Sequence, residues 1–183
     1  MNAYGLELKF SGGALPRLSD GSVIEGYASL FGVADQGGDV VLPGAYAAGL
    51  KRLAEKGGRV RMLWQHDPAQ PIGVWEEIRE DERGLWVKGR LLIEVAQARE
   101  AASLVAAGAI DGLSIGYRTV SAERDAKGRR ALSEVELWEV SLVTFPMLPD
   151  ARVGAKAAEQ PQITGGDALA GAFAAATEAL RAL

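Results

Sequence analysis

The chain has 183 residues, 48% of them hydrophobic, with no cysteine, one histidine and a formal net charge of −4. This length and apolar content fit a single domain with a sizeable core. The absence of cysteine excludes disulfide bonds and thiolate zinc sites, and a lone histidine argues against a catalytic zinc centre made of protein ligands. We therefore expect neither a metal nor another cofactor.

The charge pattern bears on the partners of the chain. A negative net charge, with no basic stripe interleaved with aromatic residues, argues against nucleic acid as the main partner. The sequence has no apolar run of about 18 residues and no signal-peptide pattern at its first residues. We expect no membrane association and a cytoplasmic location.

In chain order, hydrophobic alternation and turn residues predict strands at 5–10, 22–31, 40–42, 60–66, 72–78, 84–92, 113–120 and 132–145. Two helices are predicted, over 45–56 behind Pro43 and over 95–107 before Gly108. Most of the strands form hairpins around short polar turns. We expect a mainly β fold with α-helices, built as an antiparallel sheet or small barrel with two or three packed helices.

The pattern of strands and helices ends near residue 149, so residues 1–149 are predicted as one domain. Residues 150–166 are rich in Ala, Gly, Gln and Pro and are predicted as a flexible linker. Residues 167–183 are predicted as an Ala-rich amphipathic helix with Asp167 as its cap. This tail could dock on the domain, bind a partner or remain loose, and the sequence favours none of these.

His66 is the only imidazole, so histidine acid–base chemistry near neutral pH depends on this residue. In the strand 60–66 it continues an apolar row with Met62 and Trp64, and Asp67-Pro68 is predicted as the following turn. A side chain at a strand end can reach a cleft. The alternative is a half-buried histidine that is hydrogen-bonded to a backbone carbonyl.

Ser114 lies in Gly-Leu-Ser-Ile-Gly at 112–116, which matches the G-x-S-x-G nucleophile pattern. An α/β-hydrolase is excluded as the explanation, because the histidine of that fold follows the serine, whereas His66 precedes it. On a strand, Ser114, Gly116 and Arg118 share one face, and the glycines leave room for a substrate backbone. Ser114 is therefore a candidate nucleophile.

A carboxylate that orients the histidine would complete a triad. Glu139 is the first candidate, because strand alternation places it in an apolar row with Leu137, where a carboxylate needs a partner. That partner is either His66 or, in an ion pair without a catalytic role, Arg118. Asp111 is a competing acid, although its glycine-flanked position suits a turn or a helix end better.

Five sequence blocks between about residues 22 and 150 resemble, in order and spacing, the prohead maturation proteases of tailed phages. The blocks are GYASLFG at 26–32, GDVVLPGAY at 38–46, LWQHD at 63–67, GLSIGY at 112–117 and LWEVSLVTFP at 137–146. The resemblance extends to proteins of prophages and gene transfer agents. Five linked blocks are far more specific than any single motif.

The resemblance implies a serine endopeptidase related to the herpesvirus assembly proteases, with a small β-barrel wrapped by helices. By position, Ser114 corresponds to the nucleophile, His66 to the general base and Glu139 to the third member. The herpesvirus enzymes use a second histidine in that third place, which this chain lacks, so the carboxylate assignment rests on the phage branch. The oxyanion is expected near Gly116 and Arg118.

The resemblance also implies the partners. Such enzymes cut the scaffold segment of the major capsid protein, and often themselves, inside the immature capsid in the host cytoplasm. Two other functions remain open from the sequence: a catalytically inactive capsid-assembly or scaffold factor, and an esterase or amidase acting on small substrates. An inactive relative is expected to have lost the serine or the histidine, and both are present here.

Overall fold

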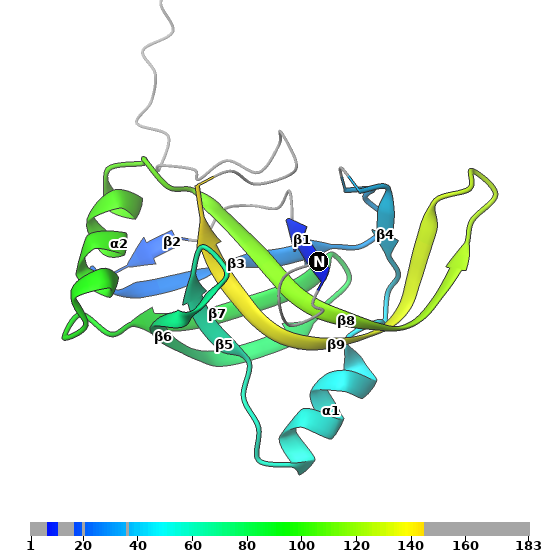
Figure 1. Cartoon of the computed structure of the whole chain (residues 1–183), viewed down its shortest axis with the longest axis horizontal. Helices are drawn as coiled ribbons and strands as arrows, with labels where there is room; N and C mark the ends of the chain where they lie inside the picture. The colour runs from blue at the N-terminus through cyan, green and yellow to red at the C-terminus, as the bar shows by residue number, and fades with distance from the viewer. Residues whose placement is uncertain (1–6, 11–16, 20, 36, 145–183) are drawn as a thin grey trace, which may run out of the picture.

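The computed structural model describes residues 7–10, 17–19, 21–35 and 37–144 (Figure 1). The helices in this part of the chain are α1 (Ala47–Glu55) and α2 (Ala96–Ala106). The strands are β1 (Glu7–Phe10), β2 (Arg17–Ser19), β3 (Val23–Leu30), β4 (Asp39–Val41), β5 (Arg61–Trp64), β6 (Asp67–Glu80), β7 (Gly84–Leu91), β8 (Gly112–Arg124) and β9 (Arg130–Val143). The predicted linker 150–166 and helix 167–183 lie outside the described residues.

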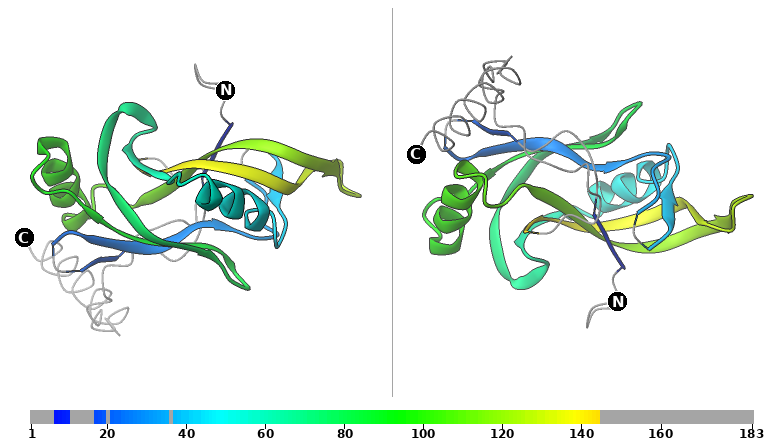
Figure 2. Two further views of the ribbon diagram at one scale, coloured as in Figure 1. Left: turned by 90° about the horizontal axis from the view of Figure 1, so that it is seen from below. Right: turned by 90° about the horizontal axis from the view of Figure 1, so that it is seen from above.

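All of these strands belong to one sheet, in the order β1-β8-β9-β5-β6-β7-β3-β2, with β4 also paired to β9. Most neighbouring strands are antiparallel, whereas β4 and β5 run parallel to β9. The sheet curls into a half-barrel, so that β3 lies across from β8 and β9 (Figure 2). The predicted mainly β fold with packed helices is confirmed.

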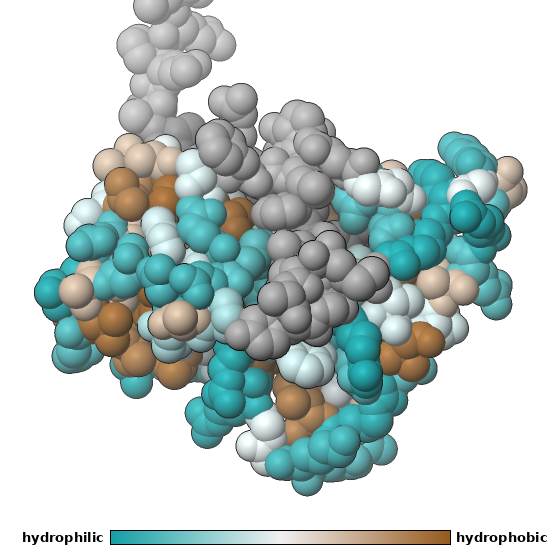
Figure 3. Space-filling view, viewed as in Figure 1, coloured by the Kyte–Doolittle hydropathy of each residue, from teal (hydrophilic) through white to brown (hydrophobic). Residues whose placement is uncertain are grey.

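The core fills the inside of the curl. Its largest fully buried side chains are Ile24, Tyr46, Met62, Ile72, Leu85, Leu91, Leu113, Ile115, Tyr117, Leu132 and Leu142. Helix α2 packs near β2, β6 and β7, and α1 lies beside β9 (Figure 1). In the view of Figure 3, hydrophilic residues predominate on the protruding β8–β9 hairpin.

Both helices end where the sequence predicts. Gly57 follows α1 with φ 65°, and Gly108 follows α2 with φ 70°, a backbone conformation that glycine adopts without a steric penalty. The Gly108 N–H donates to the carbonyl of Val105 at 3.0 Å and so satisfies a carbonyl at the helix end. Within the described residues, no helix is both long enough and apolar enough to cross a membrane.

One predicted turn is wrong. Asp67 and Pro68 are the first residues of β6, and the chain reverses one step earlier, at Gln65 and His66. His66 therefore belongs to the turn and does not continue the apolar row of β5. The proline is tolerated because it lies where β6 bulges away from β5, between the pairs Trp64–Asp67 and Leu63–Pro71.

Candidate active site

Three neighbouring strands in the middle of the sheet bring the candidate residues together. Ser114 on β8 lies opposite Ser141 on β9, and Gly116 lies opposite Glu139. Directly paired residues of antiparallel strands have Cα atoms about 4.5–5.5 Å apart, and their side chains share a face. Ser114 and Glu139 are thus near neighbours on one face of the sheet, although they are 25 residues apart in sequence.

A bulge in β9 gives Glu139 this position. Gly116 pairs with Glu139 and the next residue, Tyr117, pairs with Leu137, so Trp138 is the extra residue. The core therefore contains Leu137 before the bulge and Val140 after it. The prediction that Glu139 shares an apolar row with Leu137 is wrong for this reason: the bulge moves Glu139 into the row of Ser114.

The turn that holds His66 has an unusual backbone. Gln65 and His66 have φ values of 53° and 62°, and the flanking residues Trp64 and Asp67 are paired. Two-residue hairpin turns of type I′ need positive φ at both central positions and usually contain glycine or asparagine. Gln65 and His66 are neither glycine nor asparagine, so this backbone conformation is strained. Strain of this kind is typical of functional sites.

Gln65 anchors this turn to the end of β9. Its backbone N–H donates to the carbonyl of Leu142 at 2.9 Å, and its side-chain amide donates to the Thr144 hydroxyl at 2.6 Å. Asp67 binds elsewhere, because its carboxylate accepts hydrogen bonds from the Ala69 backbone and the Gln70 side chain. Asp67 thereby fixes the start of β6, while Gln65 holds His66 over β9.

The imidazole of His66 contacts Glu139 directly. Nδ1 lies 2.5 Å from Oε1, and the two side chains are only 10% and 5% exposed. The other carboxylate oxygen, Oε2, accepts a hydrogen bond of 2.5 Å from the Ser141 hydroxyl. An ionised carboxylate can only accept a hydrogen bond, so we assign the proton of this contact to Nδ1 of His66. Nε2 is then the nitrogen without a proton, which can act as a base.

Ser114 is fully buried, as is Ser141 opposite it. A nucleophile, a histidine and a carboxylate that orients the histidine are the groups that acyl transfer uses. The structure brings Glu139 and His66 into contact and places Ser114 in the same row of the sheet. Among the described residues, no cluster of His, Asp or Glu could hold a metal ion.

Gly116 and Arg118 occupy different surroundings. A Cβ atom at Gly116 would collide with the carboxylate of Glu139, so the glycine makes space for that side chain. Arg118 is 60% exposed and forms an ion pair of 2.6 Å with Glu136, not with Glu139. Their assignment to the oxyanion site stays a prediction, whereas the alternative Arg118–Glu139 ion pair is not what the structure contains.

Sequence reasoning missed Ser141 and the bulge at Trp138. Ser141 follows Glu139 by two residues, the spacing that puts side chains on one face of a strand, and this signal was available in the sequence. The bulge had no local signal, because it appears only when β8 and β9 are aligned.

The profile of the caudovirus prohead serine proteases matches residues 14–164. The chain belongs to this family. It is 32% identical over 154 residues to the prohead protease of Enterobacteria phage HK97, an alignment that covers 81% of this chain and 64% of that relative. The chain thus spans a little under two thirds of the length of that protein.

A solved structure supports the fold of the family member described here. The bacteriophage T4 capsid assembly protease aligns with a TM-score of 0.62, covering 77% of this chain and 98% of its own, at 18% sequence identity. This likeness concerns the fold alone. The family resemblance that the five sequence blocks indicated is confirmed by the family match.

Proposed function

We propose that this chain is a serine endopeptidase of capsid maturation, with Ser114 as nucleophile, His66 as general base and Glu139 as the group that orients His66. The observation that supports it most is the 2.5 Å contact between His66 Nδ1 and Glu139 Oε1, with Ser114 in the same row of the sheet. Family membership supports the reaction class.

In the proposed reaction, Nε2 of His66 takes the hydroxyl proton of Ser114 as Oγ attacks the peptide carbonyl. The tetrahedral intermediate collapses, the C–N bond breaks, and Nε2 returns the proton to the departing amine. A water molecule then gives a proton to Nε2 and attacks the acyl carbonyl; the C–Oγ bond breaks, Nε2 returns the proton to Oγ of Ser114, and the acid is released. Backbone donors near Gly116 are proposed to stabilise the oxyanion.

The proposed substrate is the scaffold segment of a major capsid protein, together with the protease chain itself. The names of the two relatives, a prohead protease and a capsid assembly protease, support this choice. The proposed place of action is the interior of the immature capsid in the cytoplasm of the host. The proposed reaction needs no cofactor, because each proton transfer uses a side chain of this protein.

Co-expression with the cognate major capsid protein tests the proposal. Intact masses of both proteins are compared for wild type, Ser114→Ala and the matched control Ser103→Ala, an exposed serine on α2. Wild type and the control are expected to shorten the capsid protein. Ser114→Ala and His66→Ala are expected to reduce the turnover number by a factor on the order of 10⁶, and Glu139→Gln by a smaller factor. Equal masses in all samples would support the catalytically inactive assembly factor instead.

A further inference from the structure

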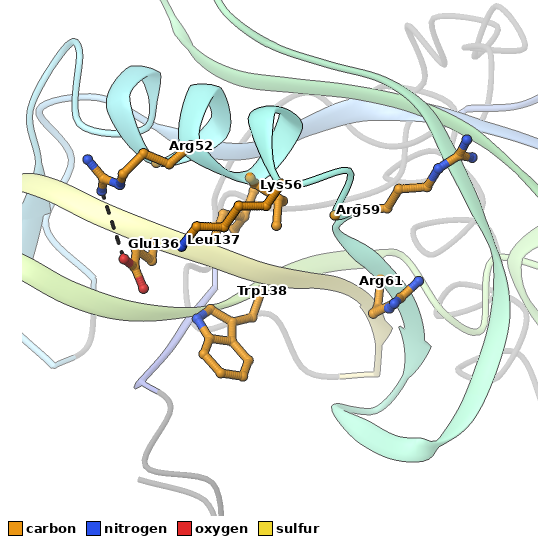
Figure 4. A pocket seen from close by; sticks show the side chains of 10 residues that line it. Arg52, Lys56, Arg59, Arg61, Glu136, Leu137 and Trp138 are labelled. Carbon is orange, nitrogen blue, oxygen red and sulfur yellow. Dashed lines mark ion pairs between the residues drawn. The ribbon is translucent and has the colours of Figure 1, made fainter.

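A groove beside the candidate active site is rich in positive charge. It lies between α1 and β9, has a volume of about 410 Å³, and is lined among others by Arg52, Lys56, Arg59, Arg61, Glu136 and Trp138 (Figure 4). We call these residues the basic groove. The volume lies in the range of sites that bind small ligands or short segments of a partner.

Most of the cations in the basic groove are not ion-paired within the described part of the chain. Arg52 is ion-paired to Glu134 at 2.7 Å and lies 3.9 Å from Glu136. Lys56, Arg59 and Arg61 are exposed and form no ion pair with any other described residue. In a chain with a net charge of −4, three such cations around one groove create a local positive potential.

Trp138 adds an apolar surface to this charge. It is 48% exposed and is the extra residue of the β9 bulge. The same bulge moves Glu139 into the row of Ser114. An exposed tryptophan among cations is typical of binding surfaces, because aromatic residues and arginine supply much of the binding energy at interfaces. The bulge therefore presents a contact residue and positions Glu139 at once.

Two residues of the basic groove are neighbours of Glu139 in the sheet. Trp138 immediately precedes Glu139 in β9, and Arg61 pairs with Glu139 in the parallel register of β5. Between its pairs with β4 and β5, β9 is covered by the start of α1: the Val135 N–H donates to the carbonyl of Ala45 at 2.9 Å, and Gly49 packs against the Val135 carbonyl. The basic groove therefore lies where α1 meets β9, and its occupant would contact side chains of both elements.

We propose that the basic groove binds an acidic segment of the polypeptide that the protease cuts, and holds it beside the reaction site. This inference rests on the proposed function, which supplies a polypeptide as the substrate. A nucleic acid is the less suitable occupant, because the groove contains the carboxylate of Glu136 and has no basic stripe that would follow a phosphate backbone.

The test is direct binding to the full chain carrying Ser114→Ala, so that no turnover occurs. The probes are a fluorescein-labelled peptide of alternating Glu and Leu and the same peptide with Gln in place of Glu, followed by fluorescence anisotropy. The groove variant is Lys56→Glu with Arg59→Glu. The control is Lys51→Glu with Lys127→Glu, which makes the same change in charge on α1 and on the β8–β9 hairpin, outside the groove lining.

The Glu peptide is expected to bind the parent and the control alike, and the groove variant about tenfold more weakly. Added salt should weaken binding, and the Gln peptide should bind poorly. Equal affinity of the groove and control variants would overturn the proposal, and so would equal binding of the two peptides. Tighter binding of a single-stranded oligonucleotide through the same residues would replace it by a nucleic-acid site.

The outcome is separable from that of the proposed function. If wild type shortens the capsid protein but the Glu peptide does not bind through the basic groove, the groove proposal fails and the peptidase stands. If the peptide binds through the groove but the capsid protein stays intact, the peptidase proposal fails and the groove remains a binding surface for acidic segments. In an active chain, the groove variant should raise KM and leave kcat unchanged.

Discussion

At the scale of single residues, Glu139 is the best-restrained group of the candidate site. His66 contacts one of its carboxylate oxygens and Ser141 donates to the other, so rotation of the carboxylate would break both contacts. The cost of burying a carboxylate is offset when hydrogen-bond donors contact both of its oxygens. Removal of one donor leaves part of the buried charge uncompensated. In the proposed mechanism, Ser141 is therefore a positioning residue that acts through Glu139.

Ser141→Ala should reduce kcat by about 10- to 100-fold, because the hydrogen bond to a charged group contributes about 1.5–3 kcal/mol to holding Glu139. KM should change little, since Ser141 is proposed to act through Glu139. Steady-state cleavage of a peptide substrate measures both constants. Ser141→Thr, which keeps the hydroxyl, should recover part of kcat, and Ser133→Ala on the β8–β9 hairpin is the control. An unchanged kcat in Ser141→Ala would exclude the positioning role.

Gly116→Ala should displace Glu139 from His66, because the added Cβ atom would overlap the carboxylate. A displacement of about 1 Å in a catalytic group can cost on the order of 10² in rate, so kcat should fall by roughly that factor. The matched control is Val120→Ala, an exposed position farther along β8. If the two variants have the same kcat in the peptide assay, Gly116 does not act by making space for Glu139.

Much of the candidate site could be predicted from single residues. The lone His66, the serine pattern at Ser114 and a carboxylate at Glu139 are all visible in the sequence. The positive φ of His66 was not, because neither residue of its turn is glycine or asparagine. The true row of Glu139 was not visible either, because it depends on the pairing of β8 with β9 and not on the alternation within β9.

At the scale of elements, hairpin turns and helix ends were the most predictable features, because their signals are local. The β6–β7 turn shows how such a signal works. One oxygen of Asp81 accepts hydrogen bonds from the backbone N–H groups of Arg83 and Gly84 at 2.8 and 3.2 Å, and the other accepts one of 2.7 Å from the Tyr27 hydroxyl. A charged turn residue thus fixes the hairpin and ties it to β3.

The pKa of Asp81 gives this turn a pH dependence. Partial burial raises the pKa, but the hydrogen bonds from Tyr27, Arg83 and Gly84 lower it more, so that it lies below its ordinary value. A carboxyl group with a lowered pKa in the folded state stabilises the fold above its unfolded pKa of about 4, and this contribution is lost as the pH falls through the lower folded value.

Asp81→Asn should therefore reduce the free energy of unfolding at pH 7 and weaken its decline on acidification below about pH 4. Urea unfolding of both proteins at a series of pH values measures the difference. Glu82→Gln, an exposed change in the same turn, is the control and should follow the wild-type curve. Parallel curves for wild type and Asp81→Asn would show that the Asp81 carboxylate is not coupled to folding.

At the scale of the whole molecule, the candidate site lies in the middle of the sheet. β9 has β8 on one edge and β5 on the other, and the remaining strands extend the same sheet on both sides. The mainly β class was predictable from the alternation. The strand order was not, because the parallel pairing of β5 with β9 joins segments such as Leu63 and Ser141 that are far apart in sequence, and no local pattern specifies such a pair.

Because a single curled sheet contains all the described strands, the described domain should unfold in one transition. The four tryptophans lie on β5, β6, β7 and β9, so their fluorescence reports the central strands, while far-UV circular dichroism reports the whole sheet. The urea midpoints of the two signals should coincide. Leu85 is a fully buried residue of β7. Leu85→Ala should reduce the free energy of unfolding by about 2–5 kcal/mol and so lower both urea midpoints together.

Leu104→Ala, a partly exposed position on α2, is the control and should leave the midpoints almost unchanged. If Leu85→Ala shifts the circular dichroism but not the fluorescence, the strands around β9 form a separate folding unit. With coincident shifts, a substitution in β7 weakens the candidate site only through the stability of the whole sheet. Leu85→Ala should then keep the wild-type kcat per folded molecule. Gly116→Ala, by contrast, should have a lower kcat even when all of the protein is folded.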